Sequence, residues 1–276
     1  MSNAAMQQEM IQALEWYADH GVCDIWLDEA QDHTEIAKEV PFVAQTITQI
    51  KPVEAAPPVF LGKSEAYEEA VRLAAGAHNL EDLQAALAGF DGIALKKTAT
   101  NMVFCDGNPK AHVMLIGEAP GADEDRQGKP FVGASGQLLD RILGCIGLDR
   151  KEEDPEKSIY ISNILNWRPP GNRTPAPSEI EVSLPFIERH IQLVRPKILI
   201  LCGGVAAKSL LNRSEGITRL RNNWHEYTPL TKGLEHLKGE NIPALATYHP
   251  SYLLRSPAQK KLVWADMIQI SKKIGK

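Results

Sequence analysis

The sequence predicts an α/β fold with three layers, α/β/α, in which helices cover both faces of a central, mostly parallel four-stranded sheet. The first observation is a series of short aliphatic or β-branched runs, typical of strands buried on both faces: His112–Gly117, Ile159–Ile164, Lys197–Cys202 and Pro243–Tyr248. The second is that stretches with helical character lie between them: Gly136–Ile146, Ser178–Val194 and Ala206–Leu211. Ser178 and Glu181 predict a capping box at the start of the longest helix. Alternating strands and helices favour a parallel sheet.

The chain ahead of this pattern is expected to be a separate region. Residues 1–75 are predicted to form an acidic N-terminal extension and linker, and residues 76–276 the α/β domain. Apolar residues recur at helical spacing over Met6–Tyr17, whereas Pro57-Pro58 favours a linker. The helices expected at the two ends of the domain are Leu80–Leu87 and Pro257–Ile274.

Charge is unevenly distributed along the chain. The formal net charge is −5, and the first 50 residues hold nine acidic residues and a single basic one. The remainder therefore carries 29 basic against 26 acidic residues, which is compatible with a phosphate-binding face. Because the acidic segment would repel a polyanion, we expect it to lie away from any such face.

Four cysteines, Cys23, Cys105, Cys145 and Cys202, are scattered without CxxC spacing. Cysteines in this pattern are more often small buried apolar groups than disulfides or metal ligands. No apolar run is long enough to span a bilayer, and the first residues lack the pattern of a signal peptide. We therefore expect a cytoplasmic protein without a membrane partner.

Polar or glycine-rich sequence follows three of the four predicted strands. Glu118 stands in GEAPG after the first, Asn163 ends the second, and His249 begins HPSYLLR after the last. Ligands of parallel sheets bind at the carboxyl ends of the strands, so these side chains are expected to share one cleft. Taken singly, each could be an ordinary turn or structural residue. The motifs GxGxxG, GxxxxGK[ST], HExxH and GxSxG are absent, which removes the main support for nucleotide, zinc-protease and serine-hydrolase sites.

Four longer strings extend these motifs: GEAPGADEDRQGKPFVGASGQLLDRIL, YISNILNWRPPGNRTP, ITRLRNNWHEY and TYHPSYLLRSP. In order and spacing they resemble the family 4 uracil-DNA glycosylases of bacteria and archaea, and the likeness covers about residues 80–275. The resemblance implies the fold of those enzymes and their reaction. Uracil is flipped out of DNA and its N-glycosidic bond is hydrolysed, which leaves an abasic site for base excision repair.

The same resemblance implies an iron–sulfur cluster, but the residues depart from the family pattern. The four cysteines that hold the cluster in the family correspond here to Phe90, Ile93, Trp167 and about Ser183. Because such a cluster requires thiolate ligands, we expect no cofactor and no metal. Phe90, Ile93 and Trp167 are expected to pack in its place.

The resemblance also assigns roles around the flipped base. Phe131 is expected to stack on uracil, and the Asn163 amide to donate to O4 and accept from N3–H, a polarity that cytosine inverts. Glu124, or the backbone near it, is expected to exclude the methyl group of thymine. Gly117 and Ala119 complete the expected uracil-binding residues.

Glu118 and His249 are the expected catalytic residues. Glu118 would stabilise positive charge on the sugar and position the attacking water, whereas a neutral His249 would donate to uracil O2 and stabilise the leaving anion. Leucines after the His motif would act as a wedge in the vacated base stack. The expected DNA contacts are Arg168, Asn172, Arg173, Ser251, Leu253, Leu254 and Arg255.

The resemblance leaves two alternatives open. One is a glycosylase with a broader base range, including hypoxanthine or mismatched thymine. The other is a catalytically silent DNA-binding repair protein. The expected partner is uracil-containing DNA, and the protein is expected to be a monomer.

Overall fold

The computed structural model describes residues 65–234 and 241–275. The helix predicted over Met6–Tyr17, the linker at Pro57-Pro58 and Cys23 lie outside the described residues. The helices are α2 (Glu65–Gly76), α3 (Leu80–Gly89), α4 (Ala122–Gln127), α5 (Ala134–Gly144), α6 (Pro177–Val194), α7 (Gly204–Leu211), α8 (Ile217–Leu220), α9 (Pro250–Arg255) and α10 (Lys260–Lys273), with 3-10 turns η1 (Ala94–Lys97), η2 (Pro170–Asn172) and η4 (Pro257–Gln259). None of these helices is long and apolar enough to cross a membrane.

The strands form one mixed sheet in the order β1-β3-β2-β4-β6-β5. They are β1 (Asp106–Gly107), β2 (Val113–Gly117), β3 (Ile159–Asn163), β4 (Ile198–Cys202), β5 (Trp224–Tyr227) and β6 (Ile242–Thr247). The four inner strands are parallel and are the four that the sequence predicts. Two antiparallel edge strands, β1 and β5, extend the sheet beyond that prediction.

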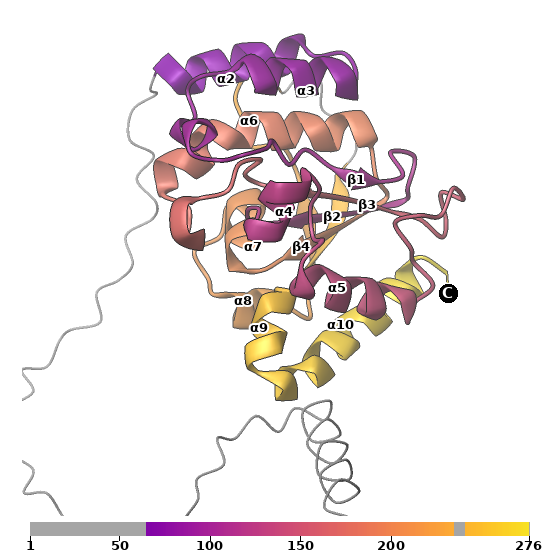
Figure 1. Ribbon diagram of the computed structural model, residues 1–276. Helices are drawn as coiled ribbons and strands as arrows, with labels where there is room; N and C mark the ends of the chain where they lie inside the picture. Colours follow the sequence, from indigo (N-terminus) through magenta and orange to yellow (C-terminus); the bar gives the residue numbers. More distant parts are fainter. Residues whose placement is uncertain (1–64, 235–240, 276) are drawn as a thin grey trace, which may run out of the picture. The chain divides into compact units, whose positions relative to one another are not determined.

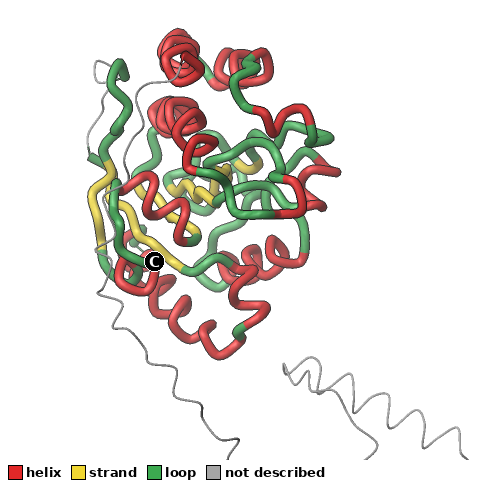
Figure 2. Tube along the Cα trace, turned by 90° about the vertical axis from the view of Figure 1, so that its left-hand side faces the viewer, coloured by secondary structure: helices red, strands yellow, loops and turns green. Residues whose placement is uncertain are grey.

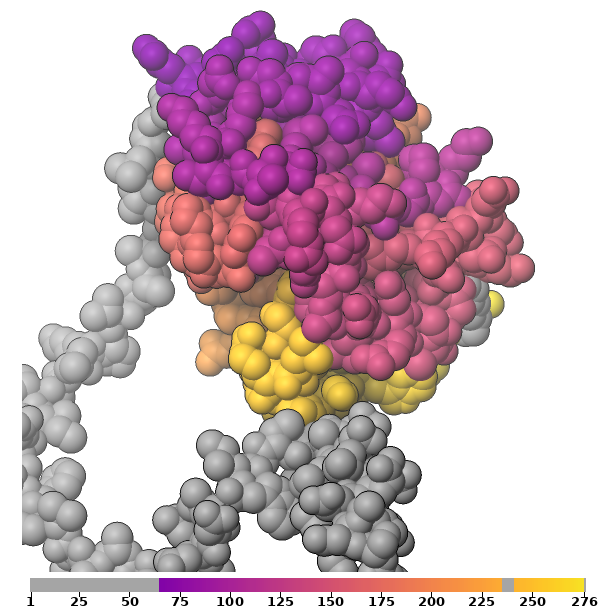
Figure 3. All heavy atoms as spheres, in the orientation of Figure 1, coloured from indigo at the N-terminus to yellow at the C-terminus, as the bar shows by residue number. Residues whose placement is uncertain are grey.

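Helices cover both faces of this sheet, which confirms the three-layer prediction (Figures 1 and 2). Successive residues of a strand point to opposite faces. Met114 and Ile116 of β2 join the core beneath α2, α3, α6 and α7, whereas Val113 and Leu115 join the core beneath α5, α9 and α10. In the space-filling view, the C-terminal helices α9 and α10 lie beside α5 (Figure 3).

Helix α2 starts before the boundary expected at residue 75. It packs against α6, and its Ala70 and Ala74 are buried in the same core as α3 and α6. The boundary itself stays a prediction.

The start of α6 differs from the predicted capping box at Ser178 and Glu181. The N-cap is Ala176, and the carboxylate of Glu179 accepts the Ala176 backbone N–H at 2.7 Å. Pro177 at the first helical position explains the earlier start, because its fixed φ suits a helix and its missing N–H needs no partner there.

The three described cysteines are free. Cys202 is buried, as expected, and Cys105 is half-buried. Cys145 is exposed, so the burial prediction is wrong for that residue. It follows α5 at the C-cap position, where the chain turns at the surface.

Candidate active site

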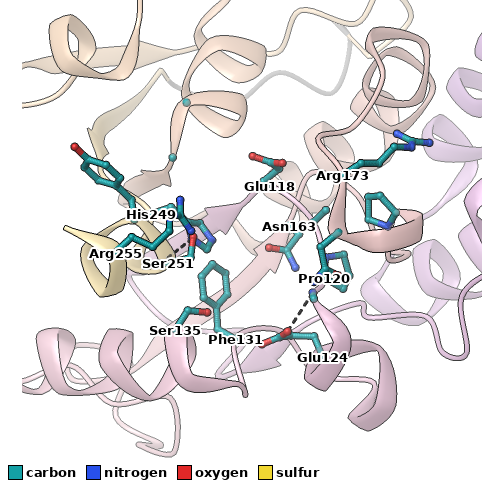
Figure 4. Close-up of a pocket in the computed structure, with 17 residues that line it drawn as sticks. Glu118, Pro120, Glu124, Phe131, Ser135, Asn163, Arg173, His249, Ser251 and Arg255 are labelled. Atoms are coloured by element: carbon teal, nitrogen blue, oxygen red, sulfur yellow. Dashed lines mark hydrogen bonds between the residues drawn. The ribbon is translucent and has the colours of Figure 1, made fainter. Parts of the chain in front are cut away.

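A cavity of about 460 Å³ opens at the carboxyl ends of the parallel strands. Glu118 lines it from the loop after β2, Asn163 from the end of β3 and His249 from the turn after β6. Figure 4 shows these three side chains facing a common space, with the Phe131 ring beside His249. The structure therefore brings together the three strand-end residues that the sequence singles out.

Asn163 presents a buried hydrogen-bond acceptor to the cavity. Its side chain is 2% exposed, and Oδ1 has no hydrogen-bond partner among the described residues. A buried unpaired oxygen of this kind costs about 1–3 kcal/mol. The site is therefore suited to a ligand that donates an N–H to this atom.

Gly117 lies directly behind Asn163 and Phe131. A Cβ atom at this position would lie 2.4 Å from Asn163 Oδ1 and 2.6 Å from Phe131 Cζ. Only a residue without a side chain permits so close an approach of the strand to both groups. Gly117 does not line the cavity itself, whereas Ala119 does.

Phe131 supplies a flat apolar wall. Its side chain is 4% exposed and lines the cavity, and its ring centroid lies 5.3 Å from that of His249. The two ring planes are inclined by 31°. A planar ligand between Asn163 and this wall could stack on the Phe131 ring.

The hydrogen bonds of His249 define its tautomer. His249 caps α9, and its Nδ1 accepts the backbone N–H of Ser251 at 3.2 Å and lies 2.8 Å from the Ser251 hydroxyl. Because Nδ1 accepts, the proton of the neutral ring lies on Nε2. Burial lowers the pKa of His249 from 6.5 to about 4. The ring is therefore neutral at pH 7 and can donate from Nε2.

Glu118 is a carboxylate in a poorly solvated place. Burial raises its pKa above the ordinary 4.5. Among the described residues no basic side chain forms an ion pair with it. Its backbone is fixed, since the Glu118 carbonyl accepts the Leu165 N–H at 3.0 Å. The carboxylate, on this fixed backbone, is available to a cation or to a polarised water.

Glu124 borders the cavity but its oxygens are engaged. Oε2 accepts the Gly121 N–H at 3.1 Å, and Oε1 accepts the N–H groups of Val132 and Gly133, each at 2.9 Å. The carboxylate joins the start of α4 to the loop that carries Phe131. Figure 4 draws it at the base of the cavity. Glu124 therefore lines the cavity, and its exclusion of the thymine methyl group stays a prediction.

The residues predicted to contact DNA differ in whether they line the cavity. Asn172, Arg173, Ser251 and Arg255 line the cavity, whereas Arg168 does not. Arg168 Nε donates to Asn172 Oδ1 at 2.7 Å. The Arg173 guanidinium is paired with both oxygens of Glu179, at 2.6 and 2.9 Å. The Ser251 hydroxyl is engaged with His249.

The two predicted wedge leucines of α9 differ in exposure. Leu253 is 0% exposed and packs in the core with α5 and α10, so the prediction that it contacts DNA is wrong. Leu254 is 46% exposed. Adjacent residues of a helix point in different directions, and the burial of one leaves the other at the surface.

Several lining residues were missed by the sequence reasoning. Gly203 and Gly204 follow β4, which matches the third predicted strand, and the strand-end rule applied to that strand would have found them. Ser135 follows Phe131 by four residues in the string PFVGAS, and Tyr252 directly follows Ser251 in HPSYLLR. The other missed lining residues are Pro120, Gly121 and Pro169.

The positions expected from the family to hold an iron–sulfur cluster do not fit one. Phe90, Ile93 and Trp167 are 1%, 3% and 4% exposed and belong to one apolar core cluster. Ser183 is buried, and its hydroxyl donates to the Glu179 carbonyl at 2.8 Å. None of the four can supply a thiolate, which is the ligand that a cluster requires.

Known proteins resemble this chain in sequence. Residues 104–268 match the model of the uracil DNA glycosylase superfamily. A Type-4 uracil-DNA glycosylase of Archaeoglobus fulgidus is 36% identical over 186 residues, which cover 66% of this chain and 86% of the relative. One from Thermotoga maritima is 32% identical over 171 residues, which cover 61% of this chain and 80% of the relative. A Type-5 uracil-DNA glycosylase of Thermus thermophilus is 30% identical over 154 residues, which cover 52% of this chain and 67% of the relative. The chain belongs to the uracil DNA glycosylase superfamily.

Proposed function

We propose that this protein is a uracil-DNA glycosylase of DNA repair, which hydrolyses the N-glycosidic bond of uracil and leaves an abasic site. The observation that carries the proposal is the meeting of Glu118, Asn163 and His249 around one cavity beside Phe131. The likeness to Type-4 uracil-DNA glycosylases supports the same substrate.

Recognition requires the base to leave the duplex, because the glycosidic bond is shielded while the base is stacked. Flipping costs a few kcal/mol, which pocket contacts must offset. Stacking on Phe131 contributes about 1–3 kcal/mol. Asn163 Oδ1 accepts uracil N3–H and the amide NH₂ donates to O4, so cytosine would leave both groups unpaired. Glu124 at the cavity border is our proposed barrier to the thymine methyl group.

Bond cleavage separates charge, and in the proposed mechanism Glu118 and His249 each stabilise one of the two charges that develop. The sugar becomes positive and the departing uracil negative. The Glu118 carboxylate stabilises the sugar cation and orients the water that attacks C1′. His249 donates from Nε2 to uracil O2 and stabilises the anion without itself carrying a charge. Arg255, Asn172 and Arg173 at the rim are the proposed phosphate contacts.

The decline of kcat/KM at acid pH is expected to follow the protonation of Glu118 rather than that of His249. The pKa of Glu118 is raised above 4.5, whereas that of His249 is lowered to about 4. As pH falls, Glu118 therefore takes up its proton first and loses its charge. We expect kcat/KM to decline as pH falls, with a midpoint above pH 4.5. Rates of uracil excision at limiting and at saturating substrate concentrations measure it.

The matched variant for this profile is His249→Leu. Loss of one preorganised donor is expected to lower kcat by about 10²–10³-fold and to leave the acid midpoint unchanged. Circular dichroism at each pH shows whether the fold persists. An acid midpoint that moves with this substitution would assign the decline to His249 and contradict the scheme.

The substrate range is tested on oligonucleotides that carry uracil, hypoxanthine or mismatched thymine, followed by alkali cleavage. We expect excision of uracil and little reaction with the other two bases. Comparable excision of hypoxanthine or thymine would favour the broader glycosylase. Binding to uracil-containing DNA without excision of any base would favour a silent repair protein.

We also propose that the protein holds no iron–sulfur cluster, because apolar side chains occupy three of the four expected ligand positions. The protein purified without oxygen is expected to contain neither iron nor acid-labile sulfide and to show no visible absorption band. An iron chelator is expected to leave uracil excision unchanged. Stoichiometric iron and sulfide in the purified protein would overturn this proposal.

Its proposed partner is uracil-containing DNA, and we propose that it acts as a cytoplasmic monomer. One cavity holds every catalytic side chain named above, so one chain suffices for the reaction. Light scattering of the free protein and of its complex with DNA measures the stoichiometry directly.

A further inference from the structure

The backbone on both sides of Phe131 is held by two side chains of opposite charge. On one side, Glu124 Oε1 accepts the N–H groups of Val132 and Gly133, each at 2.9 Å. On the other, the Arg150 guanidinium donates to the carbonyls of Pro130 at 2.9 Å and Phe131 at 3.0 Å. One backbone group of each of four consecutive loop residues, 130–133, is thereby fixed without any regular secondary structure.

This fixation matters because Phe131 has an unfavourable backbone conformation. Its φ is +53°, a left-handed value that costs a bulky L-residue free energy and persists only where surrounding contacts enforce it. Gly136 of α5 adds to the enforcement. A Cβ atom there would lie 1.9 Å from the Phe131 carbonyl oxygen, so the helix is in close contact with the loop.

Arg150 is itself held in place. Its side chain is 8% exposed, and Nε and Nη2 donate to Asp140 Oδ1 at 2.9 and 2.6 Å. Nη1 also donates to Asp106 Oδ2 at 3.2 Å. A planar guanidinium with several donors can meet two carboxylates and two carbonyls at once, which a lysine ammonium cannot. The hydrogen-bonding groups of Arg150 are therefore oriented before any ligand binds.

We propose that Arg150 is a positioning residue for base recognition, which holds the Phe131 ring as a preformed stacking surface. The proposal rests on the proposed function, since Phe131 is the side chain that would stack on uracil. Among the described residues the guanidinium of Arg150 hydrogen-bonds to the loop carbonyls and to the carboxylates of Asp140 and Asp106, and Arg150 does not line the cavity. Its effect on the ligand is therefore transmitted through Phe131.

A residue with this role affects binding of the base more than the chemical step. Stacking contributes to the ground state and the transition state alike, and removal of such an interaction raises KM while kcat changes little. We expect Arg150→Met to weaken inhibition by free uracil about tenfold and to raise KM for uracil-containing DNA by a similar factor. Affinity for DNA with an abasic site, which lacks the base, is expected to stay unchanged.

A double-mutant cycle separates positioning from general destabilisation. If Arg150 acts through the Phe131 ring, Phe131→Ala combined with Arg150→Met should bind free uracil no more weakly than Phe131→Ala alone. Arg150→Lys should recover only part of the loss. Additive effects in the cycle, or unchanged uracil inhibition in Arg150→Met, would overturn the proposal.

Two further variants keep the test decisive. Arg126→Met is the matched control, since the Arg126 side chain is 72% exposed and, among the described residues, forms an ion pair with Asp123 alone, on its own short helix. Uracil inhibition should not change in this variant. If Arg150→Met does not fold, Asp140→Asn removes the charge of a half-exposed partner of Arg150 and should likewise weaken inhibition by uracil.

Uracil excision by the wild-type protein is measured in parallel. Its absence would reject the proposed function, whereas excision with unaltered uracil inhibition in Asp140→Asn would reject only the role of Arg150.

Discussion

We expect Asn163→Leu to lower kcat/KM for uracil excision by about 10⁴-fold while the melting temperature stays the same or rises. A site built to hydrogen-bond its substrate loses about this much when one partner is lost. Stability is expected to behave differently, because Asn163 Oδ1 is buried and has no hydrogen-bond partner in the part of the chain that the structure describes. Replacing an unpaired polar group with an apolar one of similar shape removes its desolvation cost. Excision kinetics and thermal unfolding measure the two effects.

Asn166 provides a matched control from the same segment. It is 5% exposed, and its Nδ2 donates to the Val103 carbonyl at 2.9 Å. Asn166→Leu leaves that carbonyl unpaired and should cost about 1–3 kcal/mol of stability, with kcat/KM little changed in the folded protein. A fall in melting temperature for Asn163→Leu as large as that for Asn166→Leu would show that Asn163 serves the fold rather than the substrate.

The inner sheet could be predicted from the sequence because burial on both faces leaves a local signal. Every residue of β2, β3 and β4 is buried, and each strand reads as a continuous apolar run apart from its end. The edge strands carry no such signal. Asp106–Gly107 is two residues long, and Trp224–Tyr227 is mostly half-buried or exposed. Their strand character depends on the neighbour they pair with, which local sequence does not reveal.

Some residues of the site could likewise be predicted from the sequence, and others could not. Residues at strand ends could be predicted, because the topology of a parallel sheet brings those ends together. Leu253 was assigned wrongly because its role depends on the direction in which α9 presents it, and that direction is set by packing against α5 and α10. Arg150 stands in no motif. Its contact with the Phe131 loop, 19 residues away in the sequence, arises only in the folded chain.

The second large effect is expected from Glu118→Gln, which keeps the shape of the side chain and removes its charge. We expect kcat to fall about 10³-fold, because the carboxylate no longer stabilises the sugar cation or orients water. Affinity for uracil-containing DNA should remain near that of the wild type. Single-turnover excision and fluorescence anisotropy of the labelled oligonucleotide measure these separately.

Stability gives this variant a second and independent signature. Burial raises the pKa of Glu118, so keeping it ionised at pH 7 costs free energy in the folded state. That cost is absent below the ordinary pKa of 4.5 and appears as pH rises through the higher folded value. Glu118→Gln should therefore melt at the same or a higher temperature at pH 7, with the difference shrinking as the pH is lowered. A carboxylate that lowers stability yet raises kcat is one whose charge serves the reaction. If instead both forms bound DNA and neither excised uracil above background, the site would be that of a silent binding protein.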